Sequence, residues 1–280
     1  MELGIFAKTF RRPDARQTLE AVRALGLRSV QFNFECAGLP SMPKEVPAPV
    51  LASIADSSRE TKVRLAALSA TFNMAHPGKE VRQEGLRRLP VVAEAAARLQ
   101  IPLLTLCTGS RDRENMWRAH PENRSPQAWA DLLETMEVAM QISGQAGIAL
   151  AIEPEPGNVV SDVRRAYALK EELRAGELLK IILDPANLLQ AGRSQHDVLD
   201  EAFDLLGEDL AIAHAKDRDG DDQTCALGHG IVDFETFFGL LHSVGFTGPV
   251  IMHGFEESDA AESTRFVRAK LREVIADALS

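Results

Sequence analysis

The sequence predicts a (β/α)₈ TIM barrel, and three observations lead to this fold class. Short apolar runs alternate with longer segments of helical periodicity along all 280 residues. Several of these runs are continuous in Val, Ile, Leu and Ala, which is typical of parallel strands covered on both faces. Eight strand–helix pairs without a linker-like gap favour one TIM-barrel domain over residues 1–280. A doubly wound open sheet is less favoured, because no G-x-G-x-x-G turn follows a strand.

The predicted strands and helices follow one another regularly. The strands cover residues 3–7, 29–33, 64–69, 103–107, 148–152, 180–183, 210–213 and 250–252. Between them, apolar residues recur at steps of three and four, as in the run from Leu86 to Leu99, which is the spacing of one helix face. Ser125 and Pro126 have the residue types of an N-cap and a first helical turn. Glycines such as Gly26 and Gly245 lie where helices return to strands.

Composition limits the class of protein. The net charge of −10 at pH 7 argues against a polyanionic partner such as nucleic acid. The three cysteines have no metal-type spacing, which favours a reduced, cytoplasmic setting. The N-terminal stretch lacks the apolar region of a signal peptide, and no apolar run is long enough to cross a bilayer. We therefore expect a cytoplasmic protein that binds neither nucleic acid nor membrane.

Four chemically active residues fall within a residue of predicted strand ends: Glu153, Asp184, His214 and His253. Catalytic groups of a TIM barrel lie at the carboxyl ends of its strands. Two carboxylates and two imidazoles offer a mixed oxygen and nitrogen shell, which suits Mn²⁺, Zn²⁺, Co²⁺ or Fe²⁺ better than Mg²⁺. The alternative is that each is a separately satisfied polar group. Their placement on consecutive strands favours the metal site.

Further polar residues gather near the same ends. The candidate substrate-binding residues are Asn73, His76, Arg111, Glu155, Asn187 and Lys216. Residues 107–123 are interpreted as a lid-like loop, in which Arg111 is a candidate for binding a phosphate or carboxylate and Trp117 for facing a sugar ring. Loop packing is the competing explanation for Asn73 and His76.

Five motifs resemble the xylose isomerase-like TIM-barrel superfamily, often labelled sugar phosphate isomerase/epimerase. They are LAIEPEPGN at 150–158, IILDPANLL at 181–189, AHAKDRDG at 213–220, GHGIVDF at 228–234 and GFTGPVIMHG at 245–254. Each motif is modest alone, but their order and spacing make a strong signal, and the resemblance covers nearly the whole chain. The resemblance implies a metal-dependent enzyme that acts on a small-molecule carbohydrate.

The epimerase branch of this superfamily holds its metal with Glu, Asp, His and Glu from the last four strands. By resemblance, Glu153, Asp184 and His214 match the first three positions, and His253 stands where the branch has glutamate. Where that branch has a D-x-x-H pattern, this chain has Asp184 followed three residues later by Asn187 instead of histidine. The arginine that follows the metal histidine in that branch has no clean match in this chain.

The resemblance also implies a mechanism, in which the metal polarises a sugar carbonyl and a carboxylate removes the adjacent proton to give an enediolate. Glu153 is the expected ligand and general base. Because His253 cannot easily act as the second carboxylate, we expect Glu256 to supply a displaced acid/base group, with Glu155 or the Lys216/Asp217 pair as alternatives.

The leading expectation is an isomerase or epimerase of a sugar, keto-sugar, sugar acid or cyclitol, with a possible homodimer by analogy of fold. A lyase or dehydratase of similar substrates and a non-catalytic barrel that has lost part of its site are the alternatives. DNA repair of the endonuclease IV type is disfavoured, because Cys107-Thr108 and Asn187 lie at positions where that trinuclear zinc site needs histidines.

Overall fold

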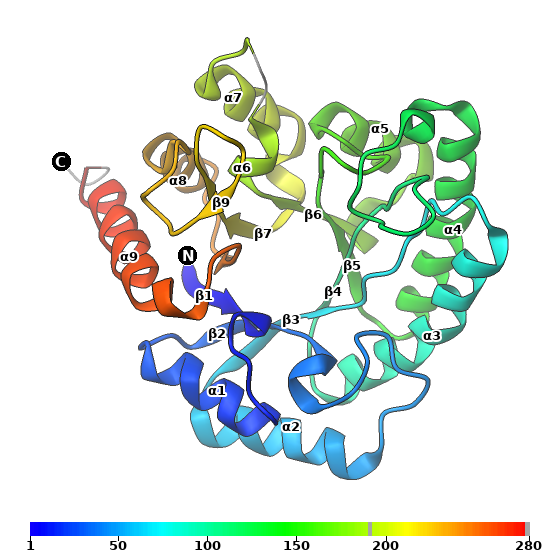
Figure 1. The fold of residues 1–280 in the computed structure, drawn as a ribbon, viewed down its shortest axis with the longest axis horizontal. Helices are drawn as coiled ribbons and strands as arrows, with labels where there is room; N and C mark the ends of the chain where they lie inside the picture. The colour runs from blue at the N-terminus through cyan, green and yellow to red at the C-terminus, as the bar shows by residue number, and fades with distance from the viewer. Residues whose placement is uncertain (190–191, 278–280) are drawn as a thin grey trace.

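Eight parallel strands close into a barrel in the computed structural model, which describes residues 1–189 and 192–277 (Figure 1). The ring runs in the order β1, β10, β7, β6, β5, β4, β3, β2. The strands are β1 (Glu2–Phe6), β2 (Ser29–Phe32), β3 (Arg64–Ser69), β4 (Leu103–Leu106), β5 (Ala149–Ile152), β6 (Leu179–Leu183), β7 (Leu210–Ala215) and β10 (Pro249–Met252). The predicted fold class is confirmed, and the observed strand ends differ from the predicted ones by at most two residues.

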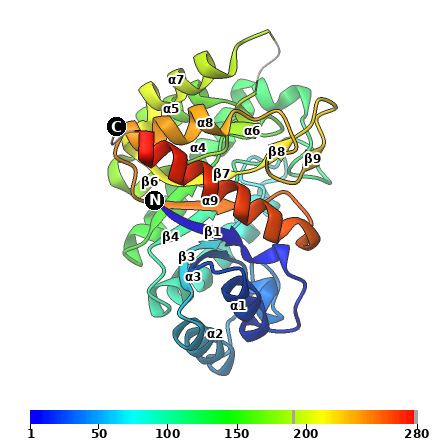
Figure 2. The same cartoon turned by 90° about the vertical axis from the view of Figure 1, so that its left-hand side faces the viewer.

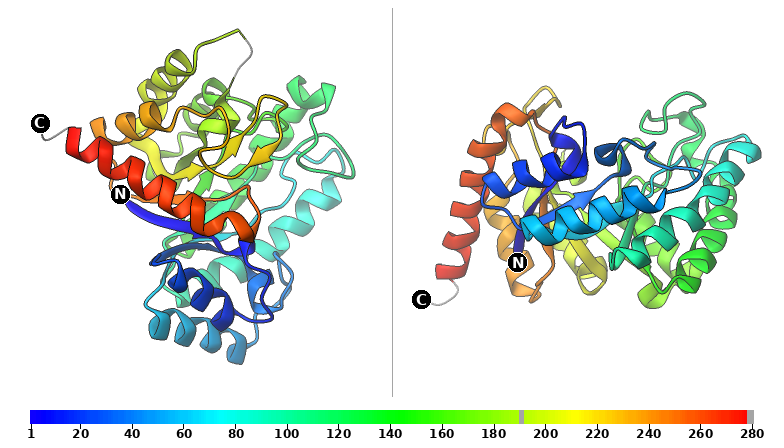
Figure 3. Two further views of the ribbon diagram at one scale, coloured as in Figure 1. Left: turned by 60° about the vertical axis from the view of Figure 1, so that its left-hand side comes forward. Right: turned by 90° about the horizontal axis from the view of Figure 1, so that it is seen from below.

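Helices surround the barrel and cover its outer face (Figure 1, Figure 2). They are α1 (Ala15–Ala24), α2 (Ala48–Thr61), α3 (Lys79–Arg98), α4 (Pro126–Gln145), α5 (Val163–Leu173), α6 (Pro185–Leu188), α7 (Gln195–Leu206), α8 (Phe234–Ser243) and α9 (Ala260–Asp277). As predicted, Ser125 caps α4, where its Oγ accepts a hydrogen bond from the Ala128 amide at 3.1 Å. The last helix, α9, packs against α8 beside β1, where the ring closes (Figure 3).

Shorter elements complete the chain. The 3₁₀ helices are η1 (Ala7–Thr9), η2 (Phe34–Ala37), η3 (Pro121–Arg124), η4 (Gly176–Leu178), η5 (Gly207–Asp209) and η6 (Glu257–Asp259). Strands β8 (Asp217–Arg218) and β9 (Thr224–Cys225) form a small antiparallel hairpin between β7 and α8. The buried Asp217 carboxylate accepts hydrogen bonds from the amides of Gly228, Gly230 and Val232, which fixes the rest of this connection. None of the helices in the described ranges has the length and apolarity needed to span a bilayer.

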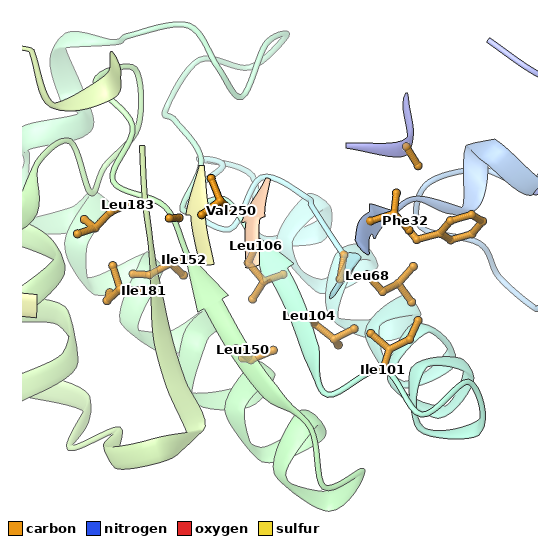
Figure 4. Packing of buried hydrophobic residues seen from close by; sticks show 14 of the residues in the cluster. Phe32, Leu68, Ile101, Leu104, Leu106, Leu150, Ile152, Ile181, Leu183 and Val250 are labelled. Carbon is orange, nitrogen blue, oxygen red and sulfur yellow. The ribbon is translucent and has the colours of Figure 1, made fainter. Parts of the chain in front are cut away.

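The strands separate two apolar layers because their side chains alternate between the two faces. Leu104 and Leu106 of β4, with Leu150 and Ile152 of β5, belong to the large cluster between the barrel and its helices (Figure 4). A second cluster contains only strand residues in its buried core: Ala67, Leu103, Ala151, Ile182, Ile212 and Ile251. This second cluster fills the barrel interior, as side-chain layers do in TIM barrels. It forms the floor on which the candidate site is built.

Two irregularities in the strand pairing set the register of this interior. Along β2 and β3 the partners change from Val30↔Leu65 to Gln31↔Ala67, so β3 carries one extra residue. Along β6 and β7 a similar shift brings Ile182 level with Ile212. Such bulges change which side chain faces inward, and they recur near active sites.

Candidate metal centre and active site

The four predicted ligands lie directly above the interior apolar layer. Each follows a member of that layer by two residues: Glu153 follows Ala151, Asp184 follows Ile182, His214 follows Ile212 and His253 follows Ile251. Two residues is the period of a strand, so the alternation that points the apolar residue inward points the polar residue inward as well. One potential ligand atom from each of the four lies within 4.8 Å of the others.

The His214 imidazole is oriented by Gln31, a residue that the sequence analysis did not single out. Its Nε2 donates a hydrogen bond to Gln31 Oε1 at 2.9 Å, so in the neutral imidazole Nδ1 carries the free lone pair. That Nδ1 is buried, has no hydrogen-bond partner and lies 3.1 Å from Glu153 Oε2. Two electron-pair donors that face each other at this distance repel, and a cation between them removes the repulsion.

Asp184 and His253 form the other half of the cluster. His253 Nε2 donates to Asp184 Oδ2 at 3.1 Å, and the two imidazole rings of the cluster lie with centroids 4.4 Å apart. Burial lowers the pKa of His253, and the neighbouring His214 lowers it further, so this imidazole is neutral and suited to a metal. To bind an ion through the same Nε2, His253 would move its proton to Nδ1.

Lys216 balances the charge of Asp184. Its Nζ lies 3.2 Å from Asp184 Oδ2, and the aspartate side chain is fully buried. Burial raises the pKa of Asp184, but Lys216 and His253 outweigh it, so the pKa lies below its ordinary value. For Lys216, burial lowers the pKa, because it disfavours the charged ammonium. Attraction by Asp184 and Glu153 outweighs this effect and raises the pKa above its ordinary value. The carboxylate and the ammonium are therefore both charged.

Asn187 joins this ion pair to two glutamates. Its Nδ2 donates to Glu153 Oε1 and to Glu155 Oε2, both at 2.6 Å, and its Oδ1 accepts from Lys216 Nζ. Glu153 thus keeps Oε2 free for an ion. Burial raises the pKa of Glu155 to about 7, with a further contribution from the Glu153 carboxylate.

A pocket of about 340 Å³ opens above the cluster. Three of the four candidate ligands line it, namely Glu153, His214 and His253, together with Glu155. The rest of its lining is mixed polar and apolar, from Phe6, Lys8, Gln31, Asn33, Glu35, Ser41, Ser69, Thr71, Thr105, Leu106, Cys107, Met116, Trp117 and Ile182. A concave site with apolar lining and a small number of placed polar groups is typical of a pocket for a small molecule.

Three pocket residues that lie within strands were missed by the sequence analysis. Gln31 Nε2 donates to Ser69 Oγ and Thr105 Oγ1, both at 3.3 Å, so three neighbouring strands share one buried polar network. The sequence analysis looked beyond the strand ends and therefore passed over them. A usable signal was present, because Ser69 and Thr105 are polar residues two positions beyond the inward-facing Ala67 and Leu103.

Other candidate residues have different surroundings. Glu256 is exposed just before η6 and is not part of the pocket lining. Arg111 is buried, and its Nη1 donates to Asp131 Oδ2 at 2.6 Å and to the Ala75 carbonyl at 3.0 Å. Its guanidinium stabilises loops around the barrel mouth and does not face the pocket.

Asn73 and His76 also hold loops together. Asn73 Nδ2 donates to the Ser110 carbonyl at 2.8 Å, and its Oδ1 accepts from the Ser110 amide at 3.0 Å. His76 Nδ1 accepts from the Gly78 amide at 2.9 Å. Neither residue lines the pocket. These contacts correspond to the loop-packing alternative.

The cluster fits a divalent cation on three counts. It has four potential ligand atoms of suitable chemistry, a buried imidazole nitrogen with a lone pair and no hydrogen-bond partner, and a neutral second imidazole. The hydrogen bond from His214 to Gln31 is the outer contact that metal-binding histidines commonly make.

Comparison with known proteins supports the same architecture. The chain is similar to the solved structure of L-ribulose 3-epimerase, with 15% identity and a TM-score of 0.79 over 99% of this chain and 97% of that one. It is similar to a D-tagatose 3-epimerase-like protein, with 15% identity and a TM-score of 0.78 over 99% of this chain and 100% of that one. It is also similar to 3-keto-D-glucoside 4-epimerase, YcjR, from E. coli, with 16% identity and a TM-score of 0.76 over 96% of this chain and 99% of that one. No curated protein sequence matches the chain significantly.

A family model for the xylose isomerase-like TIM barrel matches residues 19–272, which is most of the chain. The match spans all four candidate ligands and seven of the eight barrel strands, from β2 to β10. The chain therefore belongs to the xylose isomerase-like TIM-barrel family.

Proposed function

We propose that this chain is a divalent-metal-dependent isomerase or epimerase of a sugar, keto-sugar, sugar acid or cyclitol. One observation carries the proposal. Two carboxylates and two imidazoles converge within 4.8 Å, and a pocket lined with hydroxyl and amide groups opens above them. The similarity to sugar epimerase structures supports the substrate class.

The proposed ion is Mn²⁺, Zn²⁺, Co²⁺ or Fe²⁺, held by Glu153, Asp184, His214 and His253. When bound, such an ion supplies Lewis-acid polarisation of the substrate carbonyl. Lys216 and Asn187 hold the carboxylates of this cluster in place from outside the pocket lining.

Glu155 takes the acid/base role in this proposal. It lines the pocket, one of its oxygens is held by Asn187, and the other has no hydrogen bond among the described residues. A carboxylate positioned in this way can remove a proton from the carbon next to a carbonyl and return it. Glu153 Oε1 accepts a hydrogen bond from Asn187, which leaves Oε2 for the ion. We therefore assign Glu153 as a metal ligand and not as the general base. Glu256, the residue favoured from the sequence, lies outside the pocket lining.

Deuterium exchange tests the proposal. In D₂O, the metal-loaded protein should catalyse exchange at the carbon beside the carbonyl of a ketose panel that contains D-fructose, D-tagatose and L-ribulose. A chelator should abolish the exchange, and Mn²⁺ or Co²⁺ should restore it. Glu155→Gln should lose exchange about 10²- to 10⁴-fold, the usual contribution of a general acid/base, while retaining the metal.

Glu256→Gln is the matched variant that separates the two candidate glutamates. The proposal expects exchange within twofold of wild type for this variant, because the side chain is exposed at the rim. If Glu256→Gln loses exchange and Glu155→Gln keeps it, the assignment of Glu155 is wrong. Absence of chelator-sensitive exchange with every ketose would contradict the enolising chemistry itself.

A lyase acting on similar substrates is the second candidate, and His253 is the observation that favours it. With an imidazole at the fourth metal position, the pocket has no second carboxylate there to return a proton to the opposite face of the sugar. A product lighter by one water, detected by mass spectrometry, identifies this reaction.

We also propose that residues 1–280 form one domain and that the protein works in the cytoplasm, with a homodimer possible by analogy of fold. The single closed barrel supports one domain, and the three free cysteines support a reducing compartment.

A further inference from the structure

Trp117 is a half-exposed aromatic residue in the wall of the pocket. The residue keeps 49% of its surface exposed and lines the same pocket as the candidate metal ligands. Among the described residues, no other ring or guanidinium packs against it. Trp129, in contrast, has Arg165 4.7 Å from its ring centroid and donates its indole N–H to Glu172. A large apolar ring left open in a pocket wall is available to a ligand.

The backbone on both sides of Trp117 is fixed by buried side chains. The carbonyl of Met116 accepts from Asn158 Nδ2 at 3.0 Å, and the carbonyl of Arg118 accepts from Ser110 Oγ at 2.6 Å. Asn158 and Ser110 are 2% and 0% exposed. The ring is therefore held by a pre-organised loop, which reduces the entropy lost when a ligand binds.

A glycine fixes the same loop against its neighbour. A Cβ atom on Gly157 would lie 2.1 Å from the Trp117 carbonyl oxygen, so only glycine allows the two backbones to approach this closely. The Gly157 carbonyl also accepts from Asn123 Nδ2 at 2.9 Å. The loops that follow β4 and β5 are therefore held together at the backbone of Trp117.

Elsewhere the pocket wall is mixed polar and apolar, and its lysine is paired. Lys8 Nζ lies 2.6 Å from Glu35 Oε2, and Asn33 Nδ2 donates to Ser41 Oγ at 2.8 Å. No arginine lines the pocket within the described residues. A phosphate or carboxylate would find no unpaired cation here, whereas sugar hydroxyls find donors and acceptors. A volume of about 340 Å³ falls in the range of roughly 300–1,000 Å³ typical for drug-sized ligands, a size class that includes a disaccharide.

We propose that Trp117 forms a distal subsite that stacks against a second, uncharged sugar ring, so that the enzyme acts on one sugar unit of a glycoside. The apolar C–H face of a sugar ring packs on the indole face, and its hydroxyl edge meets the paired polar groups. This proposal rests on the proposed function, because it assumes that the first sugar unit lies at the metal cluster.

Intrinsic fluorescence provides a direct test, since the chain has only two tryptophans. In a Trp129→Phe background, the remaining emission comes from Trp117. The metal-loaded protein is titrated with D-fructose and with isomaltulose and lactulose, two disaccharides whose fructose unit keeps a free keto group. We expect at least one disaccharide to change the emission and to bind about tenfold more tightly than fructose, a ratio that corresponds to about 1.4 kcal/mol.

Trp117→Ala should reduce that preference to within twofold, measured by calorimetry, and Trp117→Phe should keep part of it. Equal Tm values for the variants and wild type exclude unfolding as the cause. The subsite proposal is overturned if neither disaccharide binds more tightly than fructose, or if binding leaves the Trp117 emission unchanged. Chelator-sensitive deuterium exchange on a monosaccharide by the wild-type protein shows that the proposed function stands even when the subsite fails.

Discussion

Replacing Gln31 tests whether the buried polar network prepares the metal site. Gln31 is 6% exposed, and its Oε1 is the acceptor for His214 Nε2 at 2.9 Å. Gln31→Met keeps the length of the side chain and removes the acceptor. The imidazole then loses the contact that keeps its Nδ1 lone pair directed at Glu153.

The expected loss of metal affinity follows from the hydrogen bond between His214 and Gln31. Loss of an outer partner of a metal-bound histidine costs about 10- to 100-fold in metal affinity, or about 1.4–2.7 kcal/mol. Leaving the buried His214 N–H unsatisfied costs about 1–3 kcal/mol by a separate argument, which agrees with this range.

Competition with a chelator of known affinity measures the effect for Zn²⁺ and Co²⁺. Gln31→Met should bind each metal about 10- to 100-fold more weakly. Gln31→Glu is the matched variant, because a carboxylate also accepts from Nε2, and it should remain within about fivefold of wild type. Circular dichroism confirms that both variants keep the barrel. Unchanged metal affinity in a folded Gln31→Met protein would refute the role of this hydrogen bond.

Three further predictions concern the loops and the ion. Asp131→Ala should lower the free energy of unfolding by about 3–5 kcal/mol in urea titration, because it leaves the buried cations Arg82 and Arg111 without their shared carboxylate; a loss below 1 kcal/mol would contradict this. Gly157→Ala should cost about 1–3 kcal/mol and shift the Trp117 emission, since the new Cβ meets a backbone oxygen; an unchanged spectrum and stability would argue against the close approach. Saturating Zn²⁺ or Co²⁺ at 100 times its Kd should add about 2.7 kcal/mol to stability, and a chelator should remove that gain in calorimetry; equal Tm values with and without metal would speak against the site.

The barrel and the candidate ligand set could be predicted from sequence because both follow from short-range periodicity. A strand places every second residue inward, so an apolar residue such as Ile212 predicts where His214 points. The same rule links Ile251 to His253. Four such pairs on separate strands meet only if the strands close into a barrel, and the strand count predicted that closure.

The choice of Glu155 over Glu256 as the proposed acid/base residue depends on local backbone geometry that the sequence does not display. After His253 the chain turns at Gly254, which has a φ of 82°, and Glu256 emerges exposed. After Glu153 the chain stays at the pocket, and Asn187, which is distant in sequence, holds Glu155 there. Spacing alone could not rank the two glutamates.

Arg111 shows the other limit of the sequence analysis. Its partner Asp131 lies 20 residues further along the chain, on α4, and the ion pair depends on how the loop after β4 packs. A guanidinium near a strand end therefore looked available to a substrate while its charge was already paired. The polar network around Gln31 went unrecognised for a related reason, because it joins three strands that are remote in sequence.

Whether the four candidate ligands hold a metal ion can be seen in a crystal structure of the protein soaked or grown with Co²⁺ or Zn²⁺, with anomalous data collected at the metal edge. We expect one anomalous peak about 2.0–2.2 Å from oxygen and nitrogen atoms of Glu153, Asp184, His214 and His253. No peak between these four side chains at saturating metal, or a peak held by other residues alone, would contradict it.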